Sequence, residues 1–123
     1  MSKHILYTII IRTKRTVECE DCGDILPKGS YMFFIGRENF CPKCGPKYCD
    51  PPESTGQRVR ALRKANKYTI PTLAEMCQMN KSMLAHYEHD RYRPGADKLV
   101  SLAVQLNTTT DYILGLSNDP NWR

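Results

Sequence analysis

The sequence predicts a small β-rich unit followed by an all-α bundle of five helices. Residues 1–47 are rich in β-branched and aromatic residues and are interrupted by two cysteine pairs. From Ser54 onward, apolar residues recur with the three-and-four spacing of amphipathic helices. Adjacent prolines, Pro51 and Pro52, lie between the two patterns and are typical of a linker. We therefore expect a first domain over residues 1–48, a linker over 49–55, a helical domain over 56–116 and a flexible tail over 117–123.

The charge of the chain is mildly basic and unevenly distributed. Its 123 residues include 18 Lys and Arg against 13 Asp and Glu, which gives a net charge of +5. Residues 55–116 carry nine basic and five acidic side chains, whereas residues 1–54 carry eight and seven. Attraction for a polyanionic partner should therefore fall mostly on the helical half. Five basic residues are expected on the polar faces of the first helix: Arg58, Arg60, Arg63, Lys64 and Lys67.

Neither a secretory signal nor a membrane-spanning segment is visible in the sequence. The apolar run from Ile5 to Ile11 is too short to cross a bilayer, and its β-branched residues favour a strand. We therefore expect a cytoplasmic protein that contacts no membrane. Because thiols stay reduced in the cytoplasm, six cysteines indicate metal binding before disulfides.

Four of the six cysteines form two pairs with the spacing of metal ligands. Two residues separate the members of each pair, and 18 residues separate the pairs. Thiolate pairs of this kind form knuckles that together hold Zn²⁺ tetrahedrally. Between the knuckles, residues 31–35 are expected to form a strand after a turn at residues 27–29. The pattern resembles a zinc ribbon with one structural Zn²⁺, whose ligands are Cys19, Cys22, Cys41 and Cys44.

The cysteines leave alternatives open. Cys49 follows Cys44 by five residues and is a candidate to replace one of the ligands. A redox switch, in which cysteines pair on oxidation, is a second alternative. Cys77 lies on the inward face of a predicted helix and is expected to be a small core residue.

The helical half begins at a capping box. Ser54 followed three residues later by Gln57 predicts the start of the first helix. A second helix is expected to begin between residues 69 and 72. Asn80 is a good N-cap for a third helix, which is expected to run to about Glu88.

Two more helices follow. A fourth helix is expected over residues 97–106, and a short fifth helix over 110–114 should end at Gly115. The fourth helix is expected to bury one broad apolar stripe made of Leu99, Val100, Leu102, Ala103 and Leu106.

Three positions in this half have a specific geometric meaning. Ala74 is small enough to let two helices approach, Gln78 lies where the chain must turn, and Leu84 points back into the same core. Residues 56–116 resemble the Cro/phage-repressor (XRE) type of helix-turn-helix domain. The segments that carry the resemblance are the Arg63 region, LAEMC, HYE, RYRP, LVSLAVQL and DYILGL. It implies a five-helix bundle whose third helix enters the major groove of DNA. A similar bundle that binds protein is the alternative.

The resemblance implies a role for each position of the third helix. Asn80 caps this recognition helix, Lys81, Ser82 and His86 face base edges, and Met83 lies at the edge of that surface. A solvated or phosphate-bound side chain is the alternative for Lys81 and for His86, and for His86 the two interpretations have equal weight. The loop that tracks the phosphate backbone consists of Arg91, Tyr92 and Arg93.

The resemblance also identifies a structural pair and three departures from the family pattern. Arg63 and Glu88 match an ion pair that joins the first helix to the third. Gln78 stands where Gly is usual at the turn, and Asp90 where Gly is frequent after the third helix. Ile70 replaces the polar residue that usually opens the second helix. These departures make prediction of an operator by analogy unsafe.

A zinc domain in front of an XRE-type domain is similar in arrangement to the MqsA-like antitoxins. We therefore expect a sequence-specific transcriptional regulator, a repressor that binds double-stranded DNA as a homodimer. The alternative is an antitoxin that binds a toxin through its zinc domain and autoregulates through its helix-turn-helix. The fourth and fifth helices are the first expectation for the dimer surface, and the zinc ribbon is the second.

Two further expectations concern chemistry and charge outside the helices. An enzyme is not expected, because the sequence offers no nucleophile with a base and no phosphate-cradling loop. The basic residues that close the first strand are interpreted as a solvated strand end, with DNA contact as the alternative: Arg12, Lys14 and Arg15.

Overall fold

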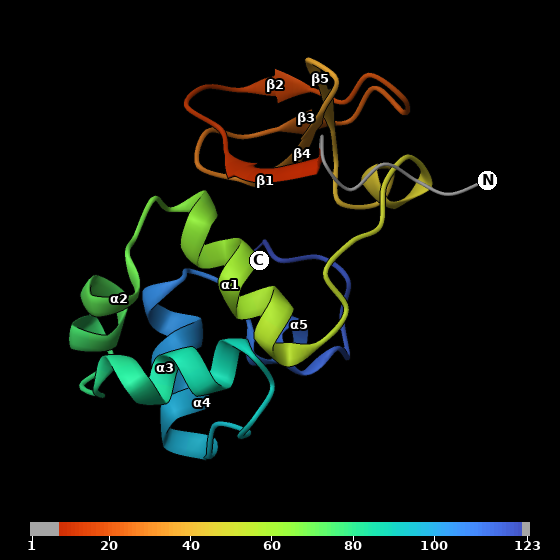
Figure 1. The fold of residues 1–123 in the computed structure, drawn as a ribbon. Coiled ribbons are helices and arrows are strands. Elements are labelled where there is room, and N and C mark those ends of the chain that lie inside the picture. The colour runs from red at the N-terminus through yellow and green to blue at the C-terminus, as the bar shows by residue number, and fades with distance from the viewer. Residues whose placement is uncertain (1–7, 122–123) are drawn as a thin grey trace. The chain divides into compact units, whose positions relative to one another are not determined.

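The computed structural model describes residues 8–121 and divides the chain into two compact units, Met1–Pro51 and Pro52–Arg123 (Figure 1). The first unit is built from strands and the second from helices. Among residues 8–121, no helix has both the length and the apolar character that crossing a membrane requires.

The first unit contains a three-stranded antiparallel sheet and a separate two-stranded ribbon. The sheet has the order β1-β4-β5, with bounds Thr8–Arg12, Tyr31–Ile35 and Glu38–Phe40. The ribbon pairs β2 with β3, with bounds Val17–Glu18 and Ile25–Leu26. A 3-10 turn, η2, spans Gly45–Lys47.

The strand that the sequence predicts at residues 31–35 is confirmed as β4, the central strand of the sheet. Its residue Phe33 lies opposite Ile10 on one side and opposite Phe40 on the other, and all three side chains are buried. The first strand ends one residue later than expected, at Arg12, and the part of the prediction before Thr8 lies outside the described residues.

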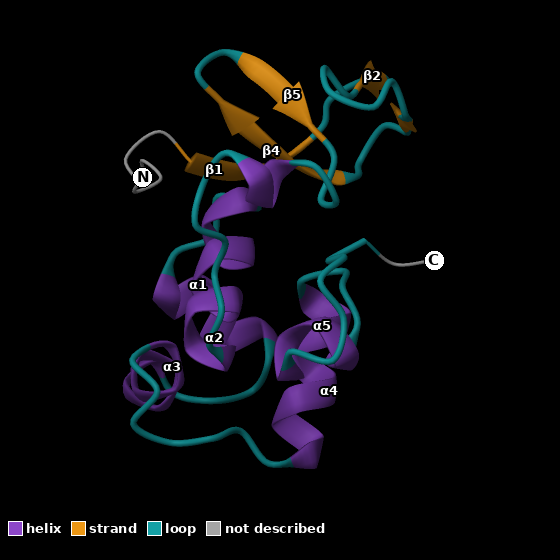
Figure 2. Ribbon diagram, turned by 90° about the vertical axis from the view of Figure 1, so that its right-hand side faces the viewer, coloured by secondary structure: helices purple, strands orange, loops and turns teal. Residues whose placement is uncertain are grey.

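The second unit consists of five helices (Figure 2). Their bounds are Thr55–Ala65 for α1, Ile70–Met76 for α2, Lys81–Glu88 for α3, Ala96–Gln105 for α4 and Thr110–Leu114 for α5. The predicted capping box is confirmed at the start of α1, where the Ser54 hydroxyl accepts from Gln57 N and the Gln57 side chain accepts from the Ser54 backbone. Gly115 ends α5 in the left-handed conformation, as expected.

The core of this unit is a single apolar cluster to which every helix contributes. Its fully buried members include Val59, Leu62, Leu73, Leu84, Leu102, Leu106 and Ile113. The expectation for Val100 is wrong, because this side chain is 53% exposed. The buried part of the expected stripe consists of Leu102 and Ala103 of α4 and its C-cap Leu106. At 3.6 residues per turn Val100 lies about 160° around the helix from Leu102, on the Ala103 edge of this stripe.

The expectation of a flexible tail also differs from the structure, because the described part of this segment is packed. Arg58 is buried and donates through Nη1 to Tyr112 O at 2.6 Å and to Ser117 O at 2.8 Å. Thr108 Oγ1 donates to Pro120 O at 2.6 Å, and both residues are buried. This segment is therefore held by two side chains, which donate to the carbonyl groups of Ser117 and Pro120.

Candidate nucleic-acid interface and metal centre

Helix α3 presents one face to solvent and buries the other. Leu84, Tyr87 and Glu88 are buried, and their three- and four-residue spacing places them on one side of the helix. Lys81 and Ser82 are exposed, and Met83 and His86 are half-buried. The short helix is therefore anchored by its inner face while a polar face remains available.

The start of α3 is defined by its cap. Asn80 has extended backbone angles, and its Oδ1 accepts from Met83 N at 2.8 Å. The cap satisfies one of the free N–H groups of the first turn. The cap also fixes the first residue of α3 as Lys81, which is where the exposed polar face of this helix begins.

The turn between α2 and α3 is a Schellman motif. Met79 N donates to Ala74 O at 2.9 Å, and Gln78 N donates to Glu75 O at 3.1 Å. Gln78 has a φ of 57°, which is the left-handed conformation that its position suggested. Lys98 of α4 donates through Nζ to Gln78 O at 2.9 Å and so stabilises this strained turn.

The C-terminal end of α3 is held by a buried, bidentate ion pair. Arg63 Nε lies 2.6 Å from Glu88 Oε2, and Arg63 Nη2 lies 3.0 Å from Glu88 Oε1. Arg63 Nη1 donates to Tyr68 O at 3.0 Å, so the guanidinium is paired on both sides. The structure thus places α3 directly against α1 through the two residues that sequence reasoning selected.

A second tie between α3 and α1 was not foreseen. Asp90 has a φ of 59°, and its Oδ1 accepts from Gly56 N at 2.8 Å while its Oδ2 accepts from Ser54 Oγ at 2.6 Å. An Asp tolerates this left-handed backbone better than most residues, and its carboxylate suits the N-terminus of a helix. A Cβ at Gly56 would lie 2.5 Å from Glu88 O, so only glycine lets the helices meet this closely.

The loop after α3 is exposed and folds back onto the helix. Arg91, Tyr92 and Arg93 are all exposed. The rings of Tyr92 and His86 are 5.1 Å apart between centroids in an edge-to-face arrangement, and Arg91 Nη1 lies 3.5 Å from His86 Nδ1. Two residues of this loop, Arg91 and Tyr92, therefore contact His86 of α3.

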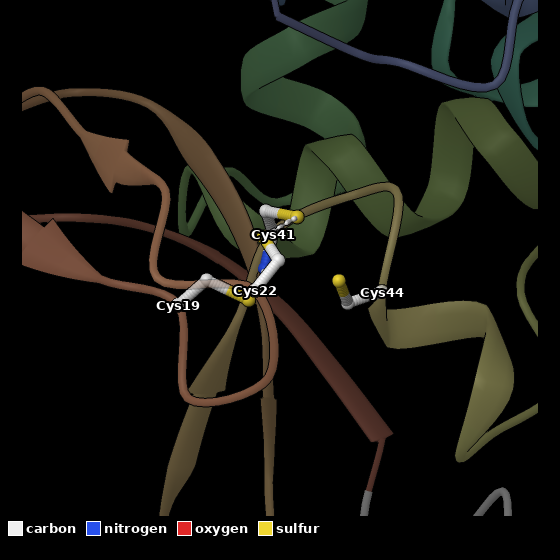
Figure 3. A group of neighbouring side chains, drawn as sticks. All are labelled: Cys19, Cys22, Cys41 and Cys44. Atoms are coloured by element: carbon white, nitrogen blue, oxygen red, sulfur yellow. Dashed lines mark hydrogen bonds between the residues drawn. The ribbon is translucent and has the colours of Figure 1, made fainter.

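In the first unit, the four cysteines chosen from their spacing come together (Figure 3). Their Sγ atoms all lie within 4.8 Å of one another, and Cys22 Sγ is 3.7 Å from Cys41 Sγ. A Zn–S bond of about 2.3 Å in a tetrahedron requires sulfur atoms about 3.8 Å apart. The cluster thus has the number, type and approximate spacing of ligands for a closed Zn²⁺ site.

Backbone hydrogen bonds shape both knuckles. Gly23 N donates to Cys19 O at 3.0 Å in the first, and Cys44 N donates to Cys41 O at 3.0 Å in the second. Gly23 has a φ of 78°, whereas Gly45 is required for another reason: a Cβ there would overlap the ring of Phe33. The second knuckle is therefore pressed directly against the central strand of the sheet.

The cysteine cluster perturbs its own thiols in opposite directions. Burial opposes ionisation of Cys19, but backbone N–H groups of Cys22, Cys41 and Asp21 outweigh it and lower the pKa of that thiol to about 6. Burial and the neighbouring thiols raise the pKa of Cys44. The cluster thus favours the thiolate form of Cys19 and the protonated form of Cys44.

The remaining cysteines lie apart from the cluster. Cys49 is fully buried, its Sγ donates to Gly45 O at 3.4 Å, and it is not among the four gathered sulfur atoms. Cys77 is buried in the helical unit, as expected for a small core residue. Among the described residues, the group close enough to share one ion is thus the paired set alone.

Sequence reasoning missed three residues that position the helices: Arg58, Asp90 as a helix cap, and Lys98. Arg58 is four residues before Leu62, so it shares the buried face of α1, and this spacing was the available signal. The partners of Asp90 and Lys98 lie 34 and 20 residues away in the chain, and no local pattern indicates them.

Five short helices, a Schellman turn before α3 and an exposed polar face on α3 define a helix-turn-helix fold. The family described as "Helix-turn-helix domain" matches residues 56–118, just over half of the chain, and the chain belongs to this family. The match begins at Gly56, the glycine on which the packing of α1 against α3 depends.

Similar proteins are found among bacterial and phage regulators. The chain is 48% identical over 65 residues to an uncharacterized HTH-type transcriptional regulator, YobD of Bacillus subtilis. The aligned region covers 53% of this chain and 58% of YobD. It is 39% identical over 62 residues to the immunity repressor protein of Bacillus phage phi105, covering 50% of this chain and 43% of the repressor. The chain thus spans about half the length of these curated relatives.

A solved structure supports the same comparison. The P22 c2 repressor protein, in complex with synthetic operator 9T, matches with a TM-score of 0.50 and 27% identity. The match covers 50% of this chain and 94% of that chain.

Proposed function

We propose that this protein is a sequence-specific DNA-binding transcriptional regulator that acts as a repressor. The observation that carries the proposal is the exposed polar face of α3, which is capped by Asn80 and anchored from behind by Leu84 and Glu88. The names of two similar proteins, an immunity repressor and a repressor bound to an operator, support the same function. In this proposal the DNA-binding domain comprises residues 56–116.

The roles of individual residues follow from their placement. Lys81 and Ser82, exposed at the first turn of α3, contact base edges, and Met83 lies against the apolar part of a base. Arg91 and Arg93 supply contacts to phosphates, which give affinity without sequence choice. The Arg63–Glu88 pair touches no DNA and keeps α3 in its orientation.

A homodimer is part of the proposal, because one recognition helix reads only a few base pairs. The surface proposed for pairing lies on α4 and α5. Val100 and Val104 of α4 and Leu114 and Leu116 at the end of α5 are large apolar side chains that are more than half exposed. A hollow of about 400 Å³, lined in part by Val100, Val104 and Thr109, adjoins them. Burying such a surface against a second copy removes apolar area from water.

We further propose that the four clustered cysteines hold one structural Zn²⁺. Four thiolates close the coordination sphere and leave no open position for catalysis, so the ion would stabilise the fold of the first unit. A unit of about 50 residues has a small core, and a metal adds the stability that such a core lacks. In the described residues we find no observation that favours the antitoxin alternative, and we do not propose it.

The proposal is tested by fluorescence anisotropy with the zinc-loaded full chain. The DNA upstream of its own reading frame is compared with a scrambled duplex at two salt concentrations. A sequence-specific regulator should prefer the upstream DNA by roughly 10³-fold or more, and the preference should persist at the higher salt. Equal and salt-sensitive affinity for both duplexes would contradict the proposal.

Two variants distinguish recognition of bases by Lys81 from the general attraction of a lysine to the phosphate backbone. Lys81→Ala should reduce the preference for the operator by about 1–3 kcal/mol, because a base contact is lost. Lys67→Ala removes the same charge from an exposed position after α1, and it should leave the preference unchanged. If the two variants behave alike, Lys81 is not part of the reading face.

A further inference from the structure

The last turn of α3 carries a small cluster that the function proposed above does not yet explain. Tyr92 is 58% exposed, yet its ring is set edge-to-face against the ring of His86 at 77°. A tyrosine that only touched a phosphate would use its hydroxyl and would need no such ring contact. The contact therefore indicates that the Tyr92 ring acts on His86.

The backbone builds this cluster. The left-handed Asp90 reverses the chain after α3, and Arg91 N donates to His86 O at 3.0 Å. The Asp90 carboxylate, bonded to Ser54 and Gly56, anchors the reversal to α1. Two interactions thus hold the loop against α3, the Arg91 N–His86 O hydrogen bond and the Tyr92–His86 ring contact. The two carboxylate bonds fix the same loop to the start of α1.

The neighbours of His86 also define its hydrogen-bonding state. The guanidinium of Arg91 lies 3.5 Å from His86 Nδ1. Because a guanidinium only donates hydrogen bonds, this contact places Nδ1 as the acceptor and leaves Nε2 as the ring nitrogen that donates. The imidazole then offers an Nε2–H donor, which matches an acceptor on a base edge in the major groove, such as guanine O6 or N7 or thymine O4.

We propose that Tyr92 is a positioning residue for base recognition and that His86 is the residue it positions. The Tyr92 ring and the Arg91 guanidinium fix the imidazole so that its Nε2–H reads one acceptor in each half-site. This inference rests on the proposed function, and it replaces a phosphate contact for Tyr92 with an indirect role in sequence choice. It also assigns His86 to the reading face.

The test is a selection of binding sites from a pool of random 30-base-pair duplexes, carried out with the full chain and its variants. Tyr92→Phe keeps the ring and should select the wild-type sequence. Tyr92→Ala should lose the preference at one base pair of each half-site by roughly 5- to 150-fold and keep the rest of the sequence. Tyr92→Leu, which keeps apolar bulk without the aromatic ring, should show the same loss and guards against a folding defect in the alanine variant.

Two further variants distinguish positioning from phosphate contact. His86→Ala should lose the same base preference, and adding Tyr92→Ala to it should cause no further loss, because both changes remove one interaction. Arg93→Ala should weaken binding to all sequences and lower the salt slope by about one, with the selected sequence unchanged.

The outcomes separate this inference from the function on which it rests. If Tyr92→Ala selects the complete wild-type sequence, or its loss adds to that of His86→Ala, the positioning role is overturned and the proposed function stands. If the wild-type chain enriches no sequence at all, the proposed function fails and this inference fails with it.

Discussion

The contact between α1 and α3 makes a sharp prediction for Gly56→Ala. In an ordinary helix this change stabilises a protein by up to about 1 kcal/mol, because alanine is the better helix former. Here a Cβ would overlap the carbonyl oxygen of Tyr87 and lie 2.5 Å from that of Glu88 and 2.8 Å from Asp90 Oδ1. The structure therefore predicts that Gly56→Ala lowers the stability of the protein.

The magnitude follows from two losses and one gain. Overpacking against rigid backbone costs about 1–3 kcal/mol. Moving the two helices apart also weakens the 2.8 Å hydrogen bond from Gly56 N to the Asp90 carboxylate, and bonds to charged groups contribute about 1.5–3 kcal/mol. After subtraction of the gain in helix propensity, the free energy of unfolding should fall by about 1.5–5 kcal/mol.

The measurement is urea denaturation of the full chain, followed by circular dichroism at 222 nm, where the helices dominate. Gly95→Ala is the control: Gly95, the N-cap of α4, has a φ of −69°, and a Cβ there meets nothing within 4 Å. The control should lose no more than about 1 kcal/mol, the cost of alanine at an N-cap. A Gly56→Ala protein as stable as the wild type would refute the close approach of α1 and α3.

Three other changes probe different parts of the molecule. Glu88→Ala leaves the buried Arg63 guanidinium unpaired and should cost about 3–5 kcal/mol in the same denaturation experiment, whereas Arg63→Met combined with Glu88→Leu should recover most of that loss. Gln78→Gly relieves a left-handed side chain at φ 57° and should raise the free energy of unfolding by about 1 kcal/mol; an unchanged midpoint would argue against strain there. Cys44→Ser should abolish stoichiometric Zn²⁺ binding in a chelator-release assay, whereas the Cys49→Ser protein should still bind one ion per chain. Equal loss of Zn²⁺ in both variants would indicate that Cys49 is a ligand.

Local signals in the sequence were sufficient for the helix starts and for the choice of the four cysteines that cluster. Ser54 and Asn80 mark helix N-termini because their side chains bond to amides only three residues away. The cysteine pairs were equally readable, because a knuckle is a local turn and its spacing is dictated by the metal. Within each helix cap and each cysteine pair the partner is nearby in the chain, whereas the meeting of the two pairs joins residues 19 positions apart.

Long-range partners explain what the sequence did not reveal. Arg58 looked like one more surface cation, but it is buried because carbonyl groups 54 and 59 residues further along surround its guanidinium. The tail was expected to be loose for the same reason, since nothing in its composition shows that Arg58 and Thr108 bind it. Val100 has the apolar character of a core residue, and only the packing of α4 shows that its side faces solvent.

The hydrogen bond from Lys98 to the carbonyl of Gln78 links two surfaces that are otherwise separate. Lys98 and the exposed Val100 and Val104 belong to the same helix, so the helix that offers apolar side chains for pairing also contacts the turn before α3. If two copies pair through α4, the act of assembly also sets the register of the reading helix within each copy. Binding to the operator and association of the subunits would then be coupled, and the coupling would pass through the hydrogen bond of the Lys98 ammonium group.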